Sequence, residues 1–207
     1  CPGMTGMTYC IEADLEMFGY LQRNLGYRMN TVLMNVLLSS DASGAPSLIR
    51  THAGTASASG AGKVTSTTID ALFSRDHHIQ AMKIDVDGYD GRVLQGAKTM
   101  LSSDRPEVIF EWHPLHCRST RNSWHTHFEV LANCGYSRFI FFTKYGDFSH
   151  YAIGYQYDTI EALANFCISS TSYEDWHYDV IALHQSSPLS IEELADCRYG
   201  RQKQSRY

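Results

Sequence analysis

Acidic residues and histidines stand at the ends of three short apolar segments that the sequence predicts to be strands. They are Glu12 after residues 7–11, Asp85 after residues 79–84, and Glu111 with His113 at the end of residues 106–112. In open α/β sheets, ligands bind beyond the carboxyl ends of the strands. These four side chains are therefore the first candidates for binding or catalysis.

Glu12 follows an early strand and comes just before a segment with helical spacing of apolar residues. A carboxylate at this place accepts hydrogen bonds from both hydroxyls of a ribose in nucleotide-binding α/β folds. The alternative is a solvated acid that the dipole of the following helix stabilises. Position alone leaves both interpretations open.

Asp85 opens the most specific stretch of the chain, residues 83–91, in which three acids fall within six residues between a strand and a helix. The acids occupy positions one, three and six, with glycines at four and seven. An EF-hand calcium loop requires acids at one, three and five and glycine at six, so this pattern argues against calcium. Asp85 is the preferred functional residue because it lies where the strand ends.

Residues 111–117 supply a carboxylate, two imidazoles and a thiol within one turn. His113 could act as a general base, because an imidazole titrates near neutral pH. Our preferred interpretation assigns no metal. The alternatives are a metal-dependent enzyme with the ligands Asp85, Glu111, His113 and His116, and ordinary polar residues in a strand-to-helix turn.

The elements that must position these residues alternate between strand and helix. The apolar pattern predicts a helix over 89–101 and strands near 7–11, 31–38, 79–84, 106–112, 138–142 and 178–183. This order predicts an α/β fold with one open, mainly parallel sheet and helices on both faces. We expect a single domain over residues 1–207.

Composition limits the partners. The chain is 43% hydrophobic with a net charge of −5, and it has no long basic run, which argues against nucleic acid. No apolar run approaches the roughly 20 residues of a membrane span. The six cysteines lack metal-ligand spacing and are expected to be reduced thiols in a cytoplasmic protein. The oligomeric state is not indicated.

Five segments of the sequence form a combined pattern. They are the acid and helix of residues 8–25, Thr68-Ile69-Asp70-Ala71-Leu72, the run Lys83–Asp90, Val93-Leu94-Gln95-Gly96-Ala97, and the strand Val108–Glu111. Together these segments resemble the FkbM family of methyltransferases. The resemblance covers about residues 6–112, and its combined spacing is specific. Asp87 and Asp90 stand where the family has longer acids.

This resemblance implies a Rossmann-like methyltransferase fold with S-adenosylmethionine as the methyl donor. It implies methylation of a hydroxyl oxygen on a sugar, lipid or natural-product acceptor, with Glu12 as the ribose-binding acid and Asp85 near the methionine end of the cofactor. The family's first strand and glycine-rich loop have no counterpart before Tyr9, so we expect both to be missing from this sequence.

The implied mechanism needs a base that removes the hydroxyl proton. His113 is our candidate, with Asp85 as the second, and we expect both to point into one cleft because one β-α-β unit joins them. A non-catalytic binding module with the same fold is the alternative that the missing glycine loop favours.

Overall fold

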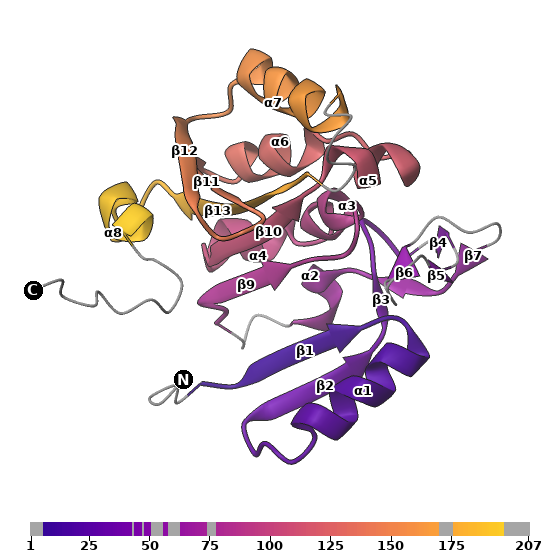
Figure 1. Cartoon of the computed structure of the whole chain (residues 1–207). Coiled ribbons are helices and arrows are strands. Elements are labelled where there is room, and N and C mark those ends of the chain that lie inside the picture. The colour runs from indigo at the N-terminus through magenta and orange to yellow at the C-terminus, as the bar shows by residue number, and fades with distance from the viewer. Residues whose placement is uncertain are drawn as a thin grey trace, which may run out of the picture.

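The computed structural model describes residues 6–42, 44–46, 48–50, 56–57, 63–73, 78–169 and 176–196 (Figure 1). Within these ranges, no helix is long and apolar enough to cross a membrane. The cysteines that lie in them, Cys10, Cys117, Cys134 and Cys167, are free thiols.

A five-stranded sheet forms the centre of the fold, in the order β12-β11-β13-β10-β9. Its strands are β9 (Ala81–Ile84), β10 (Glu107–Trp112), β11 (Tyr136–Thr143), β12 (Phe148–Ile153) and β13 (Tyr178–His184). Only β9 and β10 pair in parallel, and the other three neighbours pair antiparallel. The predicted mainly parallel sheet is therefore wrong for this part of the chain, because β11 turns back into β12 through a tight connection and β13 then inserts antiparallel between β10 and β11.

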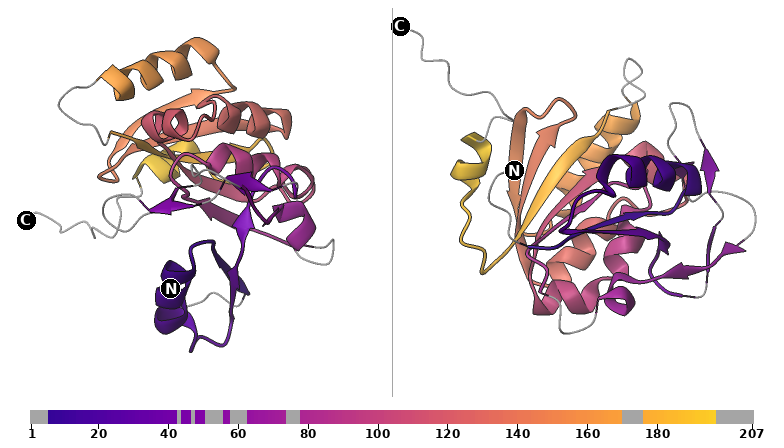
Figure 2. Two further views of the ribbon diagram at one scale, coloured as in Figure 1. Left: turned by 90° about the vertical axis from the view of Figure 1, so that its right-hand side faces the viewer. Right: turned by 90° about the horizontal axis from the view of Figure 1, so that it is seen from below.

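A separate pair of parallel strands carries the N-terminal part of the described chain. β1 (Thr8–Glu12) pairs with β2 (Thr31–Asn35), and α1 (Leu15–Leu25) connects them. The Asp14 carboxylate caps α1 by accepting hydrogen bonds from the backbone of Glu16 and Met17, at 2.9 and 3.0 Å. Figures 1 and 2 show that this unit lies to one side of the five-stranded sheet. The expected strand, acid and helix are confirmed here.

Short strand pairs follow β2 and lie beside the end of the unit just described (Figure 1). β3 (Leu37–Leu38) pairs in parallel with β8 (Ser66–Thr67), and α2 (Ile69–Leu72) begins directly after β8. Two further antiparallel pairs are β4 (Ala45–Pro46) with β7 (Lys63–Val64), and β5 (Ile49–Arg50) with β6 (Ala56–Ser57).

The predicted helix over 89–101 is two helices, α3 (Asp90–Gln95) and α4 (Lys98–Ser103). Gly96 lies at the break, where a β-carbon would stand 2.2 Å from the carbonyl oxygen of Ser39. The Asp70 carboxylate then accepts hydrogen bonds from the backbone of Thr99 and Met100, both at 2.9 Å. Asp70 therefore caps α4 from another element and stabilises the new start of the helix.

The main core lies on one face of the five-stranded sheet. Val108, Phe110 and Trp112 of β10 alternate toward it and are completely buried. Residues of α3, α4, α6 (Thr126–Asn133) and α7 (Tyr157–Ser169) pack against these side chains. The alternate residues Ile140 and Phe142 of β11 face the opposite side and pack near α8 (Ile191–Asp196). Helices thus pack on both faces of the sheet.

Candidate functional site

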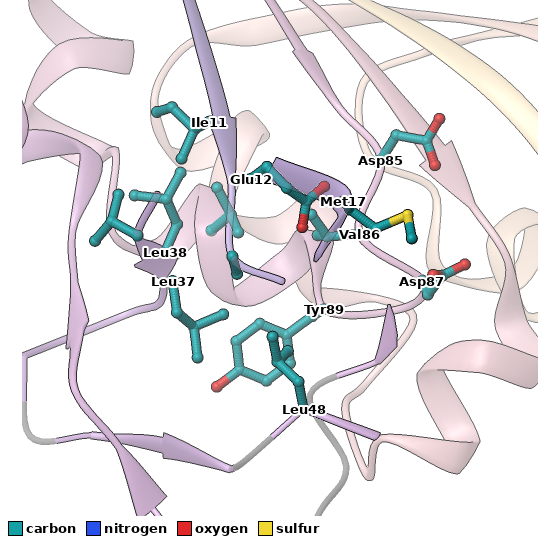
Figure 3. Close-up of a pocket in the computed structure, with 13 residues that line it drawn as sticks. Ile11, Glu12, Met17, Leu37, Leu38, Leu48, Asp85, Val86, Asp87 and Tyr89 are labelled. Carbon is teal, nitrogen blue, oxygen red and sulfur yellow. The ribbon is translucent and has the colours of Figure 1, made fainter. Parts of the chain in front are cut away.

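A cavity of about 360 Å³ lies where β1, β3 and β9 end, and this is the size of a small-molecule site. Its walls are mostly apolar and include Met17, Leu37, Leu38, Leu48 and Val93. Three carboxylates, those of Glu12, Asp85 and Asp87, also line it. Figure 3 shows Asp85 and Asp87 on the side opposite Leu37 and Leu38. The cavity therefore joins an apolar wall to an acidic one.

Glu12 is the last residue of β1 and is half-buried at the cavity. Its Oε1 accepts a hydrogen bond from the backbone N–H of Asp14 at 2.7 Å, which fixes the carboxylate. No residue that the structure describes donates to Oε2, so this oxygen retains its acceptor capacity. Asn35 donates through Nδ2 to the carbonyl oxygen of Glu12 at 2.8 Å and ties the strand end to β2.

Asp85 follows β9 directly and lines the same cavity. Its Oδ2 lies 2.8 Å from Nζ of Lys83, and both side chains are largely exposed. Exposed ion pairs contribute little to stability, about 0–1 kcal/mol. The Asp85 carboxylate is therefore a surface charge at the cavity rather than a structural support.

Asp90, the third acid of this stretch, has a structural function. It is completely buried, and it accepts hydrogen bonds from the backbone N–H groups of Val86 and Gly88, at 3.3 and 3.2 Å. Burial raises the pKa of the Asp90 carboxyl to about 7. These hydrogen bonds fold the segment between β9 and α3 back on itself and fix the direction of its side chains.

Gly88, in the segment between β9 and α3, packs against α5 (Pro114–Ser119), the helix that follows β10. Its φ is +82°, and a β-carbon here would stand 2.3 Å from the carbonyl carbon of His116. The carbonyl oxygen of Gly88 accepts hydrogen bonds from Oγ1 of Thr120 at 3.0 Å and from Nδ2 of Asn122 at 3.1 Å. Only glycine allows so close an approach with this backbone conformation.

This contact brings together a second group of side chains, Asp87, Glu111 and His116. One ligand atom of each lies within 4.8 Å of the others. Nδ1 of His116 is 3.5 Å from Oδ1 of Asp87 and 3.9 Å from Oε1 of Glu111. Burial, together with the charges of four nearby aspartates, raises the pKa of Glu111 to about 8. They are Asp85, Asp90, Asp87 and Asp179.

Two more histidines surround this group. The ring of His113 stacks on that of His116, with centroids 3.6 Å apart. Nε2 of His177 lies 3.6 Å from Oε2 of Glu111. His113 itself is only 1% exposed and does not line the cavity, whereas Asp85 does. The structure therefore does not place Asp85 and His113 in one cleft.

Among the residues selected from the sequence, Glu12 and Asp85 meet at the cavity, and Glu111 and His116 meet beside it. Asp87 and His177 were missed. The sequence offered a signal for Asp87, since it is one of three acids between β9 and α3, but His177 stands alone before β13 with no motif around it.

Comparison with known protein families identifies the family of this chain. The methyltransferase FkbM domain matches residues 5–138, well over half of the chain. The match defines the protein as a methyltransferase, and therefore as an enzyme. The chain belongs to the FkbM family. No curated protein and no solved structure matches it significantly.

Proposed function

We propose that this methyltransferase transfers the methyl group of S-adenosylmethionine to a hydroxyl oxygen of a small-molecule or glycan acceptor, such as a sugar, a lipid or a natural product. The observation that carries the proposal is the cavity with the Glu12 carboxylate at the end of β1. Membership of the FkbM family supports the methyl transfer itself. It also favours an enzyme over the alternative of a non-catalytic binding module.

The residues at the cavity fit this cofactor. Glu12 has one oxygen held by the backbone of Asp14 and a second without a donor among the described residues, as an acceptor of ribose hydroxyls requires. Leu37 and Leu38 provide apolar surface of the kind that a purine ring packs against. When bound, the cofactor supplies an electrophilic methyl group.

The chain must then orient the acceptor and take up its proton. Asp85 is the better placed of the two candidates, because its carboxylate lines the cavity and is exposed. His113 stays a candidate from the sequence. It is buried and stacks on His116, and neither of the two rings lines the cavity.

Calorimetric titration with S-adenosylmethionine tests the assignment of Glu12. Glu12→Ala should weaken binding by roughly tenfold to a hundredfold, which corresponds to about 1–3 kcal/mol for a lost acceptor of hydrogen bonds. Glu16→Ala is the matched control, since this acid is exposed on α1 and does not line the cavity. Equal affinities in the two variants would show that Glu12 does not hold the ribose.

Transfer of radiolabelled methyl groups to a panel of hydroxyl acceptors tests the base. Asp85→Asn should reduce turnover by about 10²–10⁴ and leave cofactor affinity nearly intact. If His113→Ala causes this loss and Asp85→Asn does not, the proton goes to the histidine. If both variants keep full turnover, neither residue is the base.

A further inference from the structure

We propose that Asp87, Glu111 and His116 form a binding site for a divalent transition-metal ion beside the cavity, at the ends of β9 and β10. Zn²⁺ is the ion that best fits the three side chains. The proposal concerns metal binding alone and holds whether or not S-adenosylmethionine is the methyl donor.

Two of the distances among the three side chains are close to those between the ligands of one metal ion. Two atoms that each lie about 2.1 Å from a tetrahedral zinc ion are about 3.4 Å apart. Nδ1 of His116 is 3.5 Å from Oδ1 of Asp87 and 3.9 Å from Oε1 of Glu111. Both distances are too long for a good hydrogen bond, and both suit an ion placed between the atoms. The ligand atoms of all three side chains lie within 4.8 Å of one another.

The His116 ring supplies the second observation. Its Nδ1 atom is buried and has no hydrogen-bond partner among the described residues, although two carboxylates face it. Buried polar atoms are normally satisfied, so such an atom requires an explanation. A bound cation would supply the missing partner.

The surroundings hold the three side chains in place before any ion binds. Gly88 packs against the backbone of His116, and Thr120 and Asn122 fasten Gly88 by hydrogen bonds. His113 stacks on the His116 ring, which fixes its plane. Such support from outside the ligand set orients the ligands of a metal and strengthens its binding.

The chemical types of the ligands decide the kind of ion. One imidazole with two carboxylates suits Zn²⁺, Mn²⁺ or Fe²⁺, whereas Mg²⁺ and Ca²⁺ prefer sets made only of oxygen. Three protein ligands leave a coordination position open, as in catalytic zinc sites. Asp87 also lines the cavity, so an ion here would lie beside a ligand bound in it.

The test uses the whole chain, treated with a chelator and then titrated with Zn²⁺ by calorimetry and with Co²⁺ by visible absorption. We expect one ion per chain. His116→Gln and Asp87→Asn should each weaken binding by about tenfold or more, and His116→Gln should also change the Co²⁺ spectrum. Asn tolerates the positive φ of +50° at position 87, so Asp87→Asn preserves the backbone. Asp85→Asn is the matched control and should retain binding.

Wild-type binding no tighter than that of the double variant His116→Gln, Asp87→Asn would overturn the proposal. Loss of binding in Asp85→Asn, with retention in His116→Gln, would overturn it as well. Far-UV circular dichroism shows whether each variant is folded. If the ligand variants do not fold, the Co²⁺ spectrum of the wild-type chain decides. An intense visible band, as expected when protein ligands surround the ion with low symmetry, supports the site. The weak spectrum of free hydrated Co²⁺ contradicts it.

Discussion

His127 is completely buried on α6, with its ring stacked on Phe110 at a centroid distance of 5.3 Å. Burial lowers the pKa of this imidazole from 6.5 to about 4, because the charged form loses its hydration in the core. The folded protein therefore holds His127 neutral at a pH where the unfolded chain already protonates it. We predict that this residue makes the protein acid-sensitive.

The sign and size follow from the two pKa values. Above pH 6.5 both states are neutral at His127, and its contribution to stability is fully present. As the pH falls from 6.5 toward about 4, only the unfolded state gains a proton, so stability is lost. The loss is about 1.4 kcal/mol for each pH unit, which amounts to about 2 kcal/mol at pH 5 and roughly 3 kcal/mol at the lower limit.

Urea unfolding followed by tryptophan fluorescence, at several pH values between about 5 and 7.5, measures this effect. His127→Phe keeps a ring in the core and removes the titration. The difference in free energy of unfolding between variant and wild type should grow by about 2 kcal/mol across this range. His78→Gln, at an exposed position, should show no such growth. Parallel curves for His127→Phe and wild type would refute the reasoning.

Two further substitutions test the junction of α2, α3 and α4. Asp70→Ala removes the acceptor for the backbone of Thr99 and Met100 and should lower the free energy of unfolding by about 1–3 kcal/mol. The exposed Asp147→Ala should change it little, and an equal effect of both would contradict the capping role. Gly96→Ala should lower the melting temperature, because its β-carbon would stand 2.2 Å from the Ser39 carbonyl oxygen. Gly19→Ala should not, because a β-carbon at this position in α1 would meet only the flexible end of the Arg23 side chain, at 3.7 Å. A stable Gly96→Ala protein would mean that the two backbones move apart at little cost.

Local signals predicted the elements well. Asp14 caps the start of α1 and Gly26 stands at its end, and capping depends on residues close together in the chain. β12 was missed, because Phe148, Tyr151 and Ile153 on this edge strand are exposed and form no apolar run. The direction of β13 was also beyond prediction, since a buried strand has the same apolar pattern whether its neighbours run parallel or antiparallel.

The candidate site also contains residues that the sequence could predict and a grouping that it could not. Glu12 and Asp85 could be selected because each directly follows a strand, and strand ends meet at a known edge of the sheet. Asp87 and His116 come together because Gly88 packs against α5, and this contact joins distant parts of the chain. No local pattern encodes that contact, so the sequence placed Asp85 in the alternative metal site where the structure has Asp87.

The unit formed by β1, α1 and β2 contains no buried apolar residue, although it carries Glu12. A segment without a core of its own opens locally at a lower free energy than the five-stranded sheet. Its amide hydrogens should therefore exchange with solvent before those of β10 and β13. Part of the cavity wall belongs to this readily opened segment and another part to the loop after β9. A small molecule that contacts both parts would slow amide exchange throughout β1 and β2, so exchange rates there would report binding before any turnover is measured.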